Sequence, residues 1–381
     1  MKRISKCKYI IATHYCVYGA AHALREFLIQ NKSNRVLFIA HPLNTGNEKS
    51  YIEVIDNGTI QSKNISSIRT RFPIANYLIE ILLTLIWVLA KRRKYHLFIG
   101  VDNLNTLTGL VLRFLGRVKK VIYYTIDYSP QRFQNKILNY LYHKIDYICV
   151  KHADVIWNVS PRIAKGREKI KGINYLDKQK VVSIGIWPDR VKITPFKKRK
   201  QHQLVFLGHL LEKQGVQLVI DAIPNIIKKI PDFHFLIIGG GEYESILKNQ
   251  VKKLKLNKYV TFTGWIKDRQ KLDKILSESV CAIAPYSPNN AGFSYYADPT
   301  KIKDYLSAGL PVIMTNVSHN AYEIQKNKCG IVVPYEKTKI ASAIIKLLSN
   351  KELLIEYRRN ALKYIKKYDW NRIFDKAFRE L

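Results

Sequence analysis

The sequence predicts an α/β protein made of two doubly wound parallel-sheet domains that face each other across a cleft. The chain has 381 residues, which is long for one hydrophobic core, so two domains are expected. Apolar, β-branched runs alternate with helix-length stretches along the whole chain, a pattern typical of parallel strands covered by helices on both faces. Between the two halves, Trp187–His202 has prolines, a dense basic run and no periodicity, which indicates a linker.

The strands are predicted from short apolar runs rich in β-branched residues. In the first half these runs are Tyr9–Thr13, Val36–Ala40, His96–Val101, Lys120–Thr125 and Val155–Val159. In the second half they are Gln203–Leu207, His234–Ile238, Tyr259–Thr263, Cys281–Pro285, Val312–Thr315 and Ile331–Val333. Helical stretches such as Ala21–Gln30 and Val216–Lys229 separate them. Ligands bind beyond the carboxyl ends of strands in such sheets, so we expect a site in the cleft.

The charge of the chain restricts its partners. The sequence has 64 Lys and Arg residues against 29 Asp and Glu residues, a formal net charge of +35. Such a surface attracts nucleic acid, an anionic membrane face or phosphorylated small molecules. We find no arginine-rich recognition helix, RNA-binding aromatic signature or zinc finger, so no specific nucleic-acid partner is expected.

Cysteine and histidine spacing gives no sign of a metal site. The five cysteines lie far apart and form no Cys-x-x-Cys pair, which argues against a zinc ribbon or a disulfide framework and fits a reducing cytosol. The histidines have no ligand spacing, and no paired-acid metal motif is present. We therefore expect neither a metal nor another cofactor.

The stretch Ile74–Ala90 is almost wholly apolar and is followed by four consecutive cations, Lys91–Lys94. It is slightly short for a membrane-spanning helix. Asn76, Glu80 and Thr84 recur at every fourth position, so they form one polar stripe on a helix. Two interpretations stay open: a helix buried between the sheet and its neighbours, or a helix that also lies in a membrane interface.

A helix start near Asp298 carries groups suited to a phosphate. Asp298 is predicted to cap the helix and Pro299 to occupy its first position. The free amides and positive dipole of this end, with the Thr300 hydroxyl and the Lys301 charge, suit a phosphate. Asp304 follows on the same face, where a carboxylate suits two ribose hydroxyls. The alternative is an ordinary capped turn with Lys301 in solvent.

Glycines follow three predicted strands of the second half. Gly208 ends the first strand, and Gly215 opens the helix that follows the short loop, a place for phosphate. The next strand ends in Gly239, Gly240 and Gly241, where backbone can approach a ligand closely. This spacing is not the dinucleotide fingerprint, so NAD is not implied. Gly264 and Trp265 end the following strand, where a nucleotide base could lie.

The order of these motifs resembles a known family. The Gly208 loop, the triple glycine, "FTGW" and "PTKIKDYLSAGLPVI" together look like the nucleotide-sugar domain of retaining glycosyltransferases of family 4, which have the GT-B fold. "YDWNRIFDKAF" is similar to the closing helices of that family, and "YGAAHALREFL" and "HADVIWNVSPRIAKGREK" resemble its first domain. The resemblance covers most of the chain.

The resemblance implies a domain plan. Residues 1–186 form a Rossmann-like, acceptor-binding domain, and residues 187–202 form the linker. Residues 203–365 form a Rossmann-like nucleotide-sugar domain, and residues 366–381 form a helix that packs back on the first domain.

The second domain departs from the family pattern in its first loop and at its two glutamate positions. His209 and Gln214 stand where the family usually has the Arg and Lys that hold the diphosphate, so we assign that role to Lys213 and Lys301. Of the two family glutamates, Asp304 matches the second, and Tyr296 occupies the position of the first.

Five further positions are predicted to face the cleft from the first domain. Asp127 follows "VIYYT" where the family often has a histidine, and a carboxylate there can stabilise positive charge developing on the sugar ring. Asp102 and Asn103 follow the preceding strand, and Gly19 precedes the first helix. Each aspartate can instead be a helix cap, and His22 can be a packed helix residue rather than a catalyst.

These observations predict an enzyme that moves a sugar from a UDP- or GDP-sugar to a lipid-linked or glycan acceptor of the cell envelope, with retention and without a metal. Asp127 and Lys301 are its expected catalytic residues. The basic charge and Ile74–Lys94 place it in the cytoplasm, peripheral on the inner face of an anionic membrane. Two alternatives remain open: an inactive GT-B binding subunit of a glycan-assembly complex, and a basic nucleic-acid-binding protein.

Overall fold

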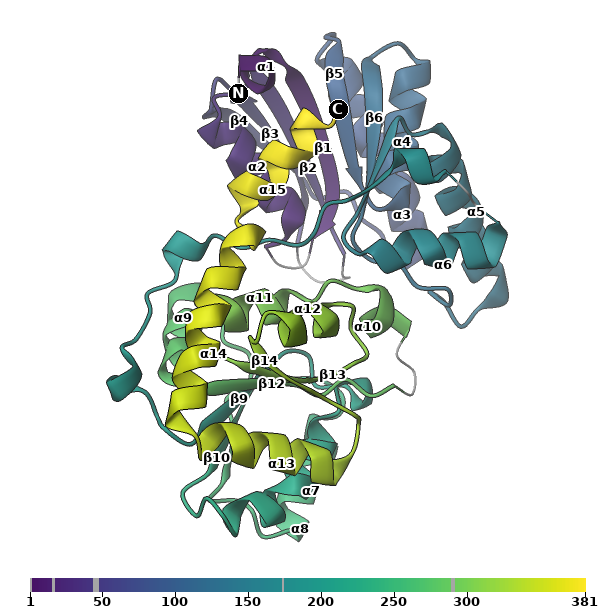
Figure 1. Ribbon diagram of the computed structural model, residues 1–381. Helices are drawn as coiled ribbons and strands as arrows, with labels where there is room; N and C mark the ends of the chain where they lie inside the picture. The colour runs from purple at the N-terminus through teal and green to yellow at the C-terminus, as the bar shows by residue number, and fades with distance from the viewer. Residues whose placement is uncertain (1, 16–17, 44–47, 173–174, 289–291) are drawn as a thin grey trace. The chain divides into compact units, whose positions relative to one another are not determined.

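The chain divides into two compact α/β units (Figure 1). The computed structural model describes residues 2–15, 18–43, 48–172, 175–288 and 292–381. The first unit comprises residues 1–183 and 370–381, and the second comprises residues 184–369. The prediction of an α/β fold with two doubly wound sheets is confirmed.

The first unit contains an eight-stranded sheet in the order β4-β3-β2-β1-β5-β6-β7-β8. Neighbouring strands from β2 through β1 to β8 are all parallel. The strands are β1 (Lys8–Tyr15), β2 (Arg35–Pro42), β3 (Ser50–Asp56), β4 (Thr59–Ser66), β5 (Tyr95–Val101), β6 (Val118–Thr125), β7 (Val155–Asn158) and β8 (Gln179–Val181).

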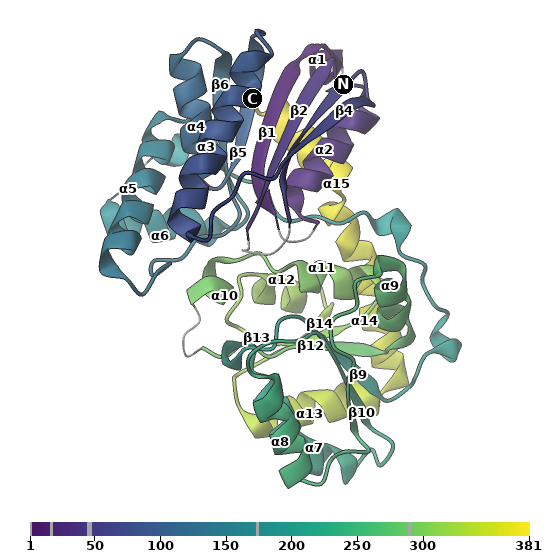
Figure 2. The ribbon, with the colours of Figure 1, turned by 180° about the vertical axis from the view of Figure 1, so that it is seen from behind.

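Helices cover both faces of this sheet (Figure 2). α2 and α15 pack together on one face, and α3, α4 and α5 lie side by side on the other. The helices are α1 (Lys2–Lys6), α2 (Ala20–Gln30), α3 (Pro73–Ala90), α4 (Asn103–Phe114), α5 (Lys136–His152), α6 (Pro161–Lys171) and α15 (Trp370–Arg379).

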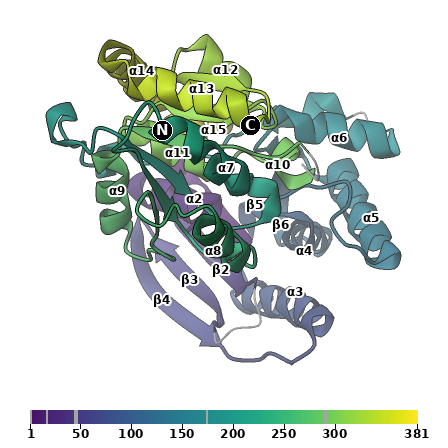
Figure 3. The same cartoon turned by 90° about the horizontal axis from the view of Figure 1, so that it is seen from below.

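One edge of the first sheet differs from the predicted parallel arrangement. β2, β3 and β4 pair antiparallel, and β4 forms the outer edge (Figure 3). The turn between β3 and β4 is Asn57-Gly58, with φ of 51° and 83°. This dipeptide is a strong hairpin signal because both of its residues tolerate positive φ. β4 itself is polar and largely exposed, so no apolar run marks it in the sequence.

The second unit has an all-parallel, six-stranded sheet in the order β11-β10-β9-β12-β13-β14. Numbered within the unit this is 3-2-1-4-5-6, the doubly wound order with a topological switch point between β9 and β12. The predicted strands match the observed ones closely. These are β9 (Gln203–Leu207), β10 (His234–Ile238), β11 (Val260–Phe262), β12 (Cys281–Ala284), β13 (Val312–Thr315) and β14 (Gly330–Val333).

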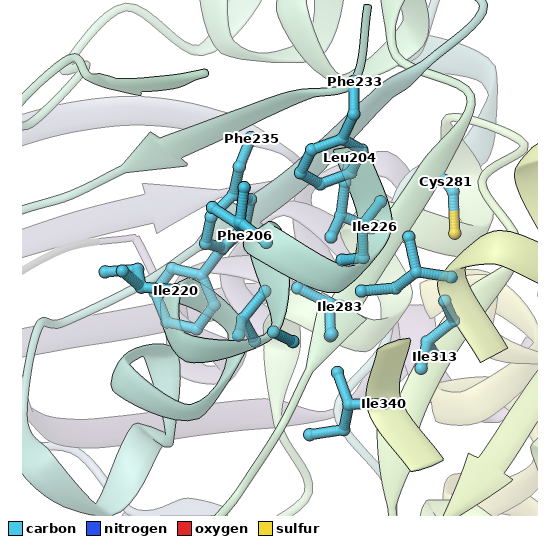
Figure 4. Packing of buried hydrophobic residues seen from close by; sticks show 14 of the residues in the cluster. Leu204, Phe206, Ile220, Ile226, Phe233, Phe235, Cys281, Ile283, Ile313 and Ile340 are labelled. Carbon is cyan, nitrogen blue, oxygen red and sulfur yellow. The ribbon is translucent and has the colours of Figure 1, made fainter. Parts of the chain in front are cut away.

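Alternate residues of these strands enter two cores, one on each face. In β9, Leu204 and Phe206 pack with Ile220 of α7 (Figure 4), and Val205 packs with the residues of α11 on the other face. The helices are α7 (Val216–Ile227), α8 (Glu244–Lys253), α9 (Arg269–Glu278), α10 (Gly292–Tyr296), α11 (Thr300–Ser307), α12 (Asn320–Lys326), α13 (Lys337–Leu348) and α14 (Lys351–Tyr364).

The segment predicted as a linker, residues 187–202, belongs to the second unit. Its Arg199 is buried and donates to the carbonyl oxygens of Ser279 (2.9 Å) and Ala308 (2.8 Å). The Thr194 hydroxyl lies 2.7 Å from that of Ser277. These contacts with residues distant in sequence hold the segment 187–202 in the second unit, although it lacks periodicity. The chain passes from the first unit to the second at residues 183–184, before the predicted linker.

The chain returns to the first unit at α15. Phe374 and Phe378 of this helix lie over Phe27 of α2, with ring centroids 5.4 and 5.9 Å apart. The closing helix was predicted from residue 366; the helix of the first unit begins at Trp370, and Ile365–Tyr368 is a separate turn in the second unit.

Among the described residues, no helix is long and apolar enough to cross a membrane. Cys7, Cys149, Cys281 and Cys329 are free thiols, and Cys16 lies outside the described residues.

Candidate functional site

The candidate site of the second unit lies at the switch point of its sheet, where β9 and β12 end. Gly208 follows β9, and Pro285 and Tyr286 follow β12. Gly215 has φ of 76°, and a Cβ there would overlap the carbonyl oxygen of Pro285. The loop after β9 is therefore pressed against the end of β12 at a position that only glycine fits.

Lys301, the second residue of α11, places its ammonium at this point. Its Nζ lies 4.3 Å from the ring centroid of Phe206 and 5.3 Å from that of Tyr286, and it donates to Oε1 of Gln214 at 2.7 Å. Among the described residues, no carboxylate forms an ion pair with it. Burial without a counter-charge lowers the pKa of Lys301 to about 7.

The glycine loop and the lysine, which the sequence separates by more than ninety positions, meet here. A Cβ on Gly208, where φ is 146°, would lie 2.6 Å from Nζ of Lys301. Gln214 accepts the hydrogen bond that Lys301 donates. The sequence did not suggest this role, because Gln214 stands where the family usually has a lysine. The two predicted phosphate motifs thus form one surface.

Trp265 and His209 form an aromatic corner beside this surface. Their rings are 5.5 Å apart in an edge-to-face arrangement, and Trp265 is 60% exposed. A Cβ on Gly240 would lie 2.8 Å from Nε1 of Trp265. The amide of Gly239 donates to the carbonyl of Gly264 (2.9 Å), and this hydrogen bond joins the ends of β10 and β11. Gly264 has φ of 68°.

The first and third glycines of the β10 loop lie against the β9 loop. A Cβ on Gly241 would lie 2.7 Å from Cδ2 of His209 and would overlap the carbonyl oxygen of Leu210. A Cβ on Gly239 would overlap the carbonyl oxygen of Gly208. Gly239 and Gly241 are therefore required for the two loops to pack against each other, and not only for a ligand to approach the backbone.

The amino end of α11 differs from its prediction in one respect. Pro299, not Asp298, is the N-cap residue, and Thr300 is the first helical residue and exposed. The Asp298 carboxylate is buried and accepts hydrogen bonds from Lys303, from Nδ2 of Asn320 (3.0 Å) and from the amide of Ile184 (2.8 Å). Since it pairs with a buried lysine, it leaves the first amides of α11 without a side-chain cap from any described residue.

Asp304 does not have the open position that the sequence predicted. It is 5% exposed, and its Oδ1 accepts from Nη2 of Arg269 at 2.7 Å. Arg269 also pairs with Asp273 of its own helix at 2.9 Å. A ribose hydroxyl would have to displace this arginine, so the structure gives Asp304 a packing role and corrects its assignment to the ribose.

Lys213 lies near the site but not beside Lys301. It is partly buried in the turn Glu212–Gln214, its Nζ is 5.1 Å from the ring centroid of Phe293, and its carbonyl accepts from the amide of Ser287 (3.0 Å). Tyr296, at the position of the missing family glutamate, packs edge-on against Tyr295, with ring centroids 5.0 Å apart.

In the first unit, Asp102 and Asp127 share one loop. The Asp102 carboxylate accepts from the amides of Ile126 (3.1 Å) and Asp127 (3.3 Å) and does not cap α4. Its backbone has φ of 64° and ψ of 173°, a strained conformation for a residue with a side chain. Burial and the neighbouring Asp127 charge raise the pKa of Asp102 to about 6. Asp127 itself is exposed.

The other predicted residues of the first unit differ in their burial. Asn103 is buried and donates to the carbonyl of Tyr142 (3.2 Å), so its expected place at an open edge was wrong. Gly19 is the N-cap of α2, with open space beside its Cα, and its amide donates to Nδ1 of His22 (3.3 Å). The His22 ring lies 5.2 Å from that of Phe38, and burial lowers its pKa.

Within the described residues, no group of three or more His, Cys, Asp or Glu side chains could hold a metal ion.

Comparison with known proteins now adds a family. Residues 201–350 match the model of Glycosyl transferases group 1. Over this range the chain is similar to glycosyltransferases of group 1. The matched range covers β9 to α13, including the Gly208 loop, Trp265 and Lys301. The resemblance to family 4 glycosyltransferases is confirmed.

One curated relative of the chain is the phosphatidyl-myo-inositol mannosyltransferase of Mycobacterium leprae. It is 26% identical over 179 residues, which are 46% of this chain and 45% of the relative. The match therefore spans about half the length of each protein.

Two solved structures extend the likeness to the whole chain. Sucrose-phosphate synthase from Thermosynechococcus elongatus has a TM-score of 0.75 at 14% identity, over 98% of this chain and 99% of that one. Anabaena HepE in complex with UDP-glucose has a TM-score of 0.73 at 16% identity, over 98% and 100%. These identities establish the fold alone, which is GT-B.

Proposed function

We propose that this protein transfers a sugar from a UDP- or GDP-sugar to a lipid-linked or glycan acceptor of the cell envelope, with retention and without a metal. The bond between the anomeric carbon and the diphosphate oxygen breaks, and an acceptor oxygen takes its place. The nucleoside diphosphate leaves with the bonding electron pair, and its oxygen takes up the proton that the acceptor hydroxyl loses. We place this reaction at the cytoplasmic face of an anionic membrane.

The observation that carries the proposal is the Lys301 ammonium. It is partly buried between Phe206 and Tyr286, donates to no carboxylate among the described residues, and donates to a neutral amide, that of Gln214. A diphosphate supplies the missing negative charge and relieves the cost of burying an unpaired cation. The amides and dipole of α11, with the exposed Thr300 hydroxyl, add donors at the same end.

The rest of the donor has suitable neighbours in the same unit. Trp265 offers an exposed ring on which a base can stack, next to His209 and Gly240. Lys213 is a second cation on the loop after β9. The UDP-glucose complex of HepE and the inositol lipid in the name of the mannosyltransferase support a nucleotide-sugar donor and a lipid acceptor.

Asp127 is our candidate for the charge that faces the sugar. It is exposed, and the buried Asp102 carboxylate holds the loop by its amides at Ile126 and Asp127. An anionic group next to the ring stabilises an oxocarbenium-like transition state, while Lys301 and the end of α11 neutralise the leaving diphosphate.

One observation favours a second candidate, a binding subunit without transferase activity. The Asp304 carboxylate is engaged by Arg269, and Tyr296 replaces the other family glutamate. Neither of the two family glutamate positions thus presents a free carboxylate, so the protein can bind the diphosphate of a nucleotide sugar without activating the sugar.

Titration calorimetry against a panel of nucleotide sugars, followed by a product assay with lipid and glycan acceptors, tests both candidates. Lys301→Met should weaken binding of the best donor by about 10- to 100-fold. The matched control Lys346→Met removes the same charge from an exposed site on α13 and should bind like the wild type. Binding without turnover supports the binding subunit. Unchanged affinity in Lys301→Met would refute the site.

A further inference from the structure

α3 buries its polar stripe, whereas an ordinary surface helix exposes its polar face to solvent. Asn76, Glu80 and Thr84 are each 3% exposed or less. Oε2 of Glu80 lies 3.0 Å from Nε2 of His14, and the Thr84 hydroxyl lies 2.8 Å from Nε2 of His41. Asn76 is hydrogen-bonded to Thr70. The polar stripe is therefore used inside the unit, and Glu80 and Thr84 are the partners of the β1 and β2 histidines.

The opposite stripe of α3 is apolar and faces solvent. Ile74, Leu78, Leu82 and Ile86 recur at every fourth position, and each is between 56% and 62% exposed. At about 1.5 Å per residue this stripe runs for roughly 18 Å along the helix. Phe72, just before the helix, continues it. A continuous apolar row of this length on a soluble surface marks an interaction site.

Cations flank this row, and the helix adds no exposed acid. Lys91, Arg92, Arg93 and Lys94 follow α3 directly, and the last three are exposed. Exposed Arg71 precedes it, with its guanidinium 5.1 Å from the ring centroid of Phe72. Glu80, the only acidic residue of α3, is buried. The row thus has the charge pattern that anionic headgroups attract.

The neighbouring helix adds apolar surface at the cationic end. α3 packs on α4 (Figure 2), and both helices run antiparallel to the strands that they cover. Their carboxyl ends therefore lie at the same edge of the sheet. There α4 ends in Phe114, which is 90% exposed, followed by exposed Leu115.

We propose that α3 docks on an anionic lipid bilayer, with Ile74, Leu78, Leu82 and Ile86 at the acyl boundary and Lys91–Lys94 among the headgroups. Charge selects this occupant over a second copy of the chain. Two copies joined through α3 would bring their cationic runs together in a protein of net charge +35. The inference uses no residue of the donor site.

Vesicle flotation of the full-length protein tests the proposal. The wild type should float with vesicles of three parts phosphatidylcholine and one part phosphatidylglycerol, and less with phosphatidylcholine alone or at high salt. The double variant Leu78→Ser/Leu82→Ser should lower the bound fraction at least about tenfold, because it removes the centre of the apolar row. The triple variant Arg92→Gln/Arg93→Gln/Lys94→Gln should lose the preference for anionic vesicles.

The matched control is Ile355→Ser, which removes an exposed apolar side chain from α14 of the second unit and should float like the wild type. All variants should keep the wild-type circular dichroism and donor affinity, so failure of docking is distinguishable from failure of the donor site. Equal flotation of the wild type and the double variant would overturn the proposal. So would a wild-type dimer, seen by sedimentation, that the double variant dissolves.

Discussion

Lys301 illustrates how position alone turns a common side chain into a binding group. The surface of this protein holds dozens of lysines, but this one has its Nζ over two aromatic rings and beside a neutral amide. Removing its hydration lowers the pKa to about 7, well below that of a solvated lysine. At neutral pH the residue is therefore poised between charged and uncharged forms.

This pKa predicts that donor affinity depends on pH. The diphosphate stabilises the charged form of Lys301 and raises its pKa in the complex, so above pH 7 the free protein must take up a proton to bind. Affinity should be flat below about pH 7 and fall by up to about tenfold per unit as the pH rises beyond it. Calorimetry with a nucleotide sugar from pH 6 to 9, in two buffers of different ionisation enthalpy, measures both the affinity and the proton uptake.

Lys301→Met should remove this slope together with most of the affinity. At pH 8 the wild type should take up about 0.9 proton per donor bound. A constant affinity over the whole range with no proton uptake would contradict the role of Lys301.

Two aspartates show what sequence reasoning about single residues cannot reach. The i, i+3 spacing placed Asp304 on one helical face with Lys301, and the Asp-Pro step suggested a cap at Asp298. Their partners, Arg269 and Lys303, decide otherwise. Arg269 comes from a helix thirty-five positions away, a contact that only the tertiary fold creates, whereas the glycine-bounded loops were predictable because they are local.

At the scale of elements, α5 and α6 are joined to the sheet through a buried guanidinium. Arg167 of α6 donates to both oxygens of Asp146 in α5, at 2.9 and 2.7 Å. It also donates to the Thr125 hydroxyl at the end of β6 (2.9 Å) and to Oδ1 of Asn158 at the end of β7 (2.8 Å). One side chain thus fixes four elements at the carboxyl edge of the first sheet, from which Asp127 extends.

Arg167→Met should destabilise the first unit by about 3–5 kcal/mol, because it leaves Asp146 buried without its counter-charge. Urea unfolding followed by tryptophan fluorescence should show the transition of this unit moved to lower denaturant. Arg93→Met, at an exposed position of the same unit, is the control. Adding Asp146→Asn to Arg167→Met should restore part of the loss, and a double variant as unstable as the single one would argue against an ion-pair origin.

Secondary structure in the second unit was predictable because its strands are apolar on both sides and need no knowledge of neighbours. In the first unit the same reasoning missed β3, β4 and β8. Of these, β4 has polar side chains that face solvent at an edge. The same reasoning also left the orientation of α3 open: a helix with three polar residues can turn them to water or to polar groups inside the unit, here Thr70, His14 and His41. The choice depends on which groups the sheet presents, which is a tertiary property.

At the scale of the whole molecule, the two units are not consecutive in sequence. The first unit is completed by the last residues of the chain, which follow the entire second unit. Phe378 of α15 is 7% exposed and lies against Phe27 (5.9 Å), Tyr9 (5.8 Å) and Trp157 (5.6 Å). The first core is therefore incomplete until the last helix has docked, and its stability depends on contacts of very long sequence separation.

Phe378→Ala should destabilise the first unit by about 3–5 kcal/mol through the cavity that it leaves. The loss should be confined to that unit, so hydrogen exchange followed by mass spectrometry should show faster exchange in β1 and α2 and unchanged exchange in β9 and α7. Phe114→Ala removes the same ring from an exposed position of the same unit and should leave both patterns unchanged in the absence of lipid. Equal acceleration in the two units would instead mean that α15 couples their unfolding, and wild-type exchange in β1 and α2 would refute the packing role of Phe378.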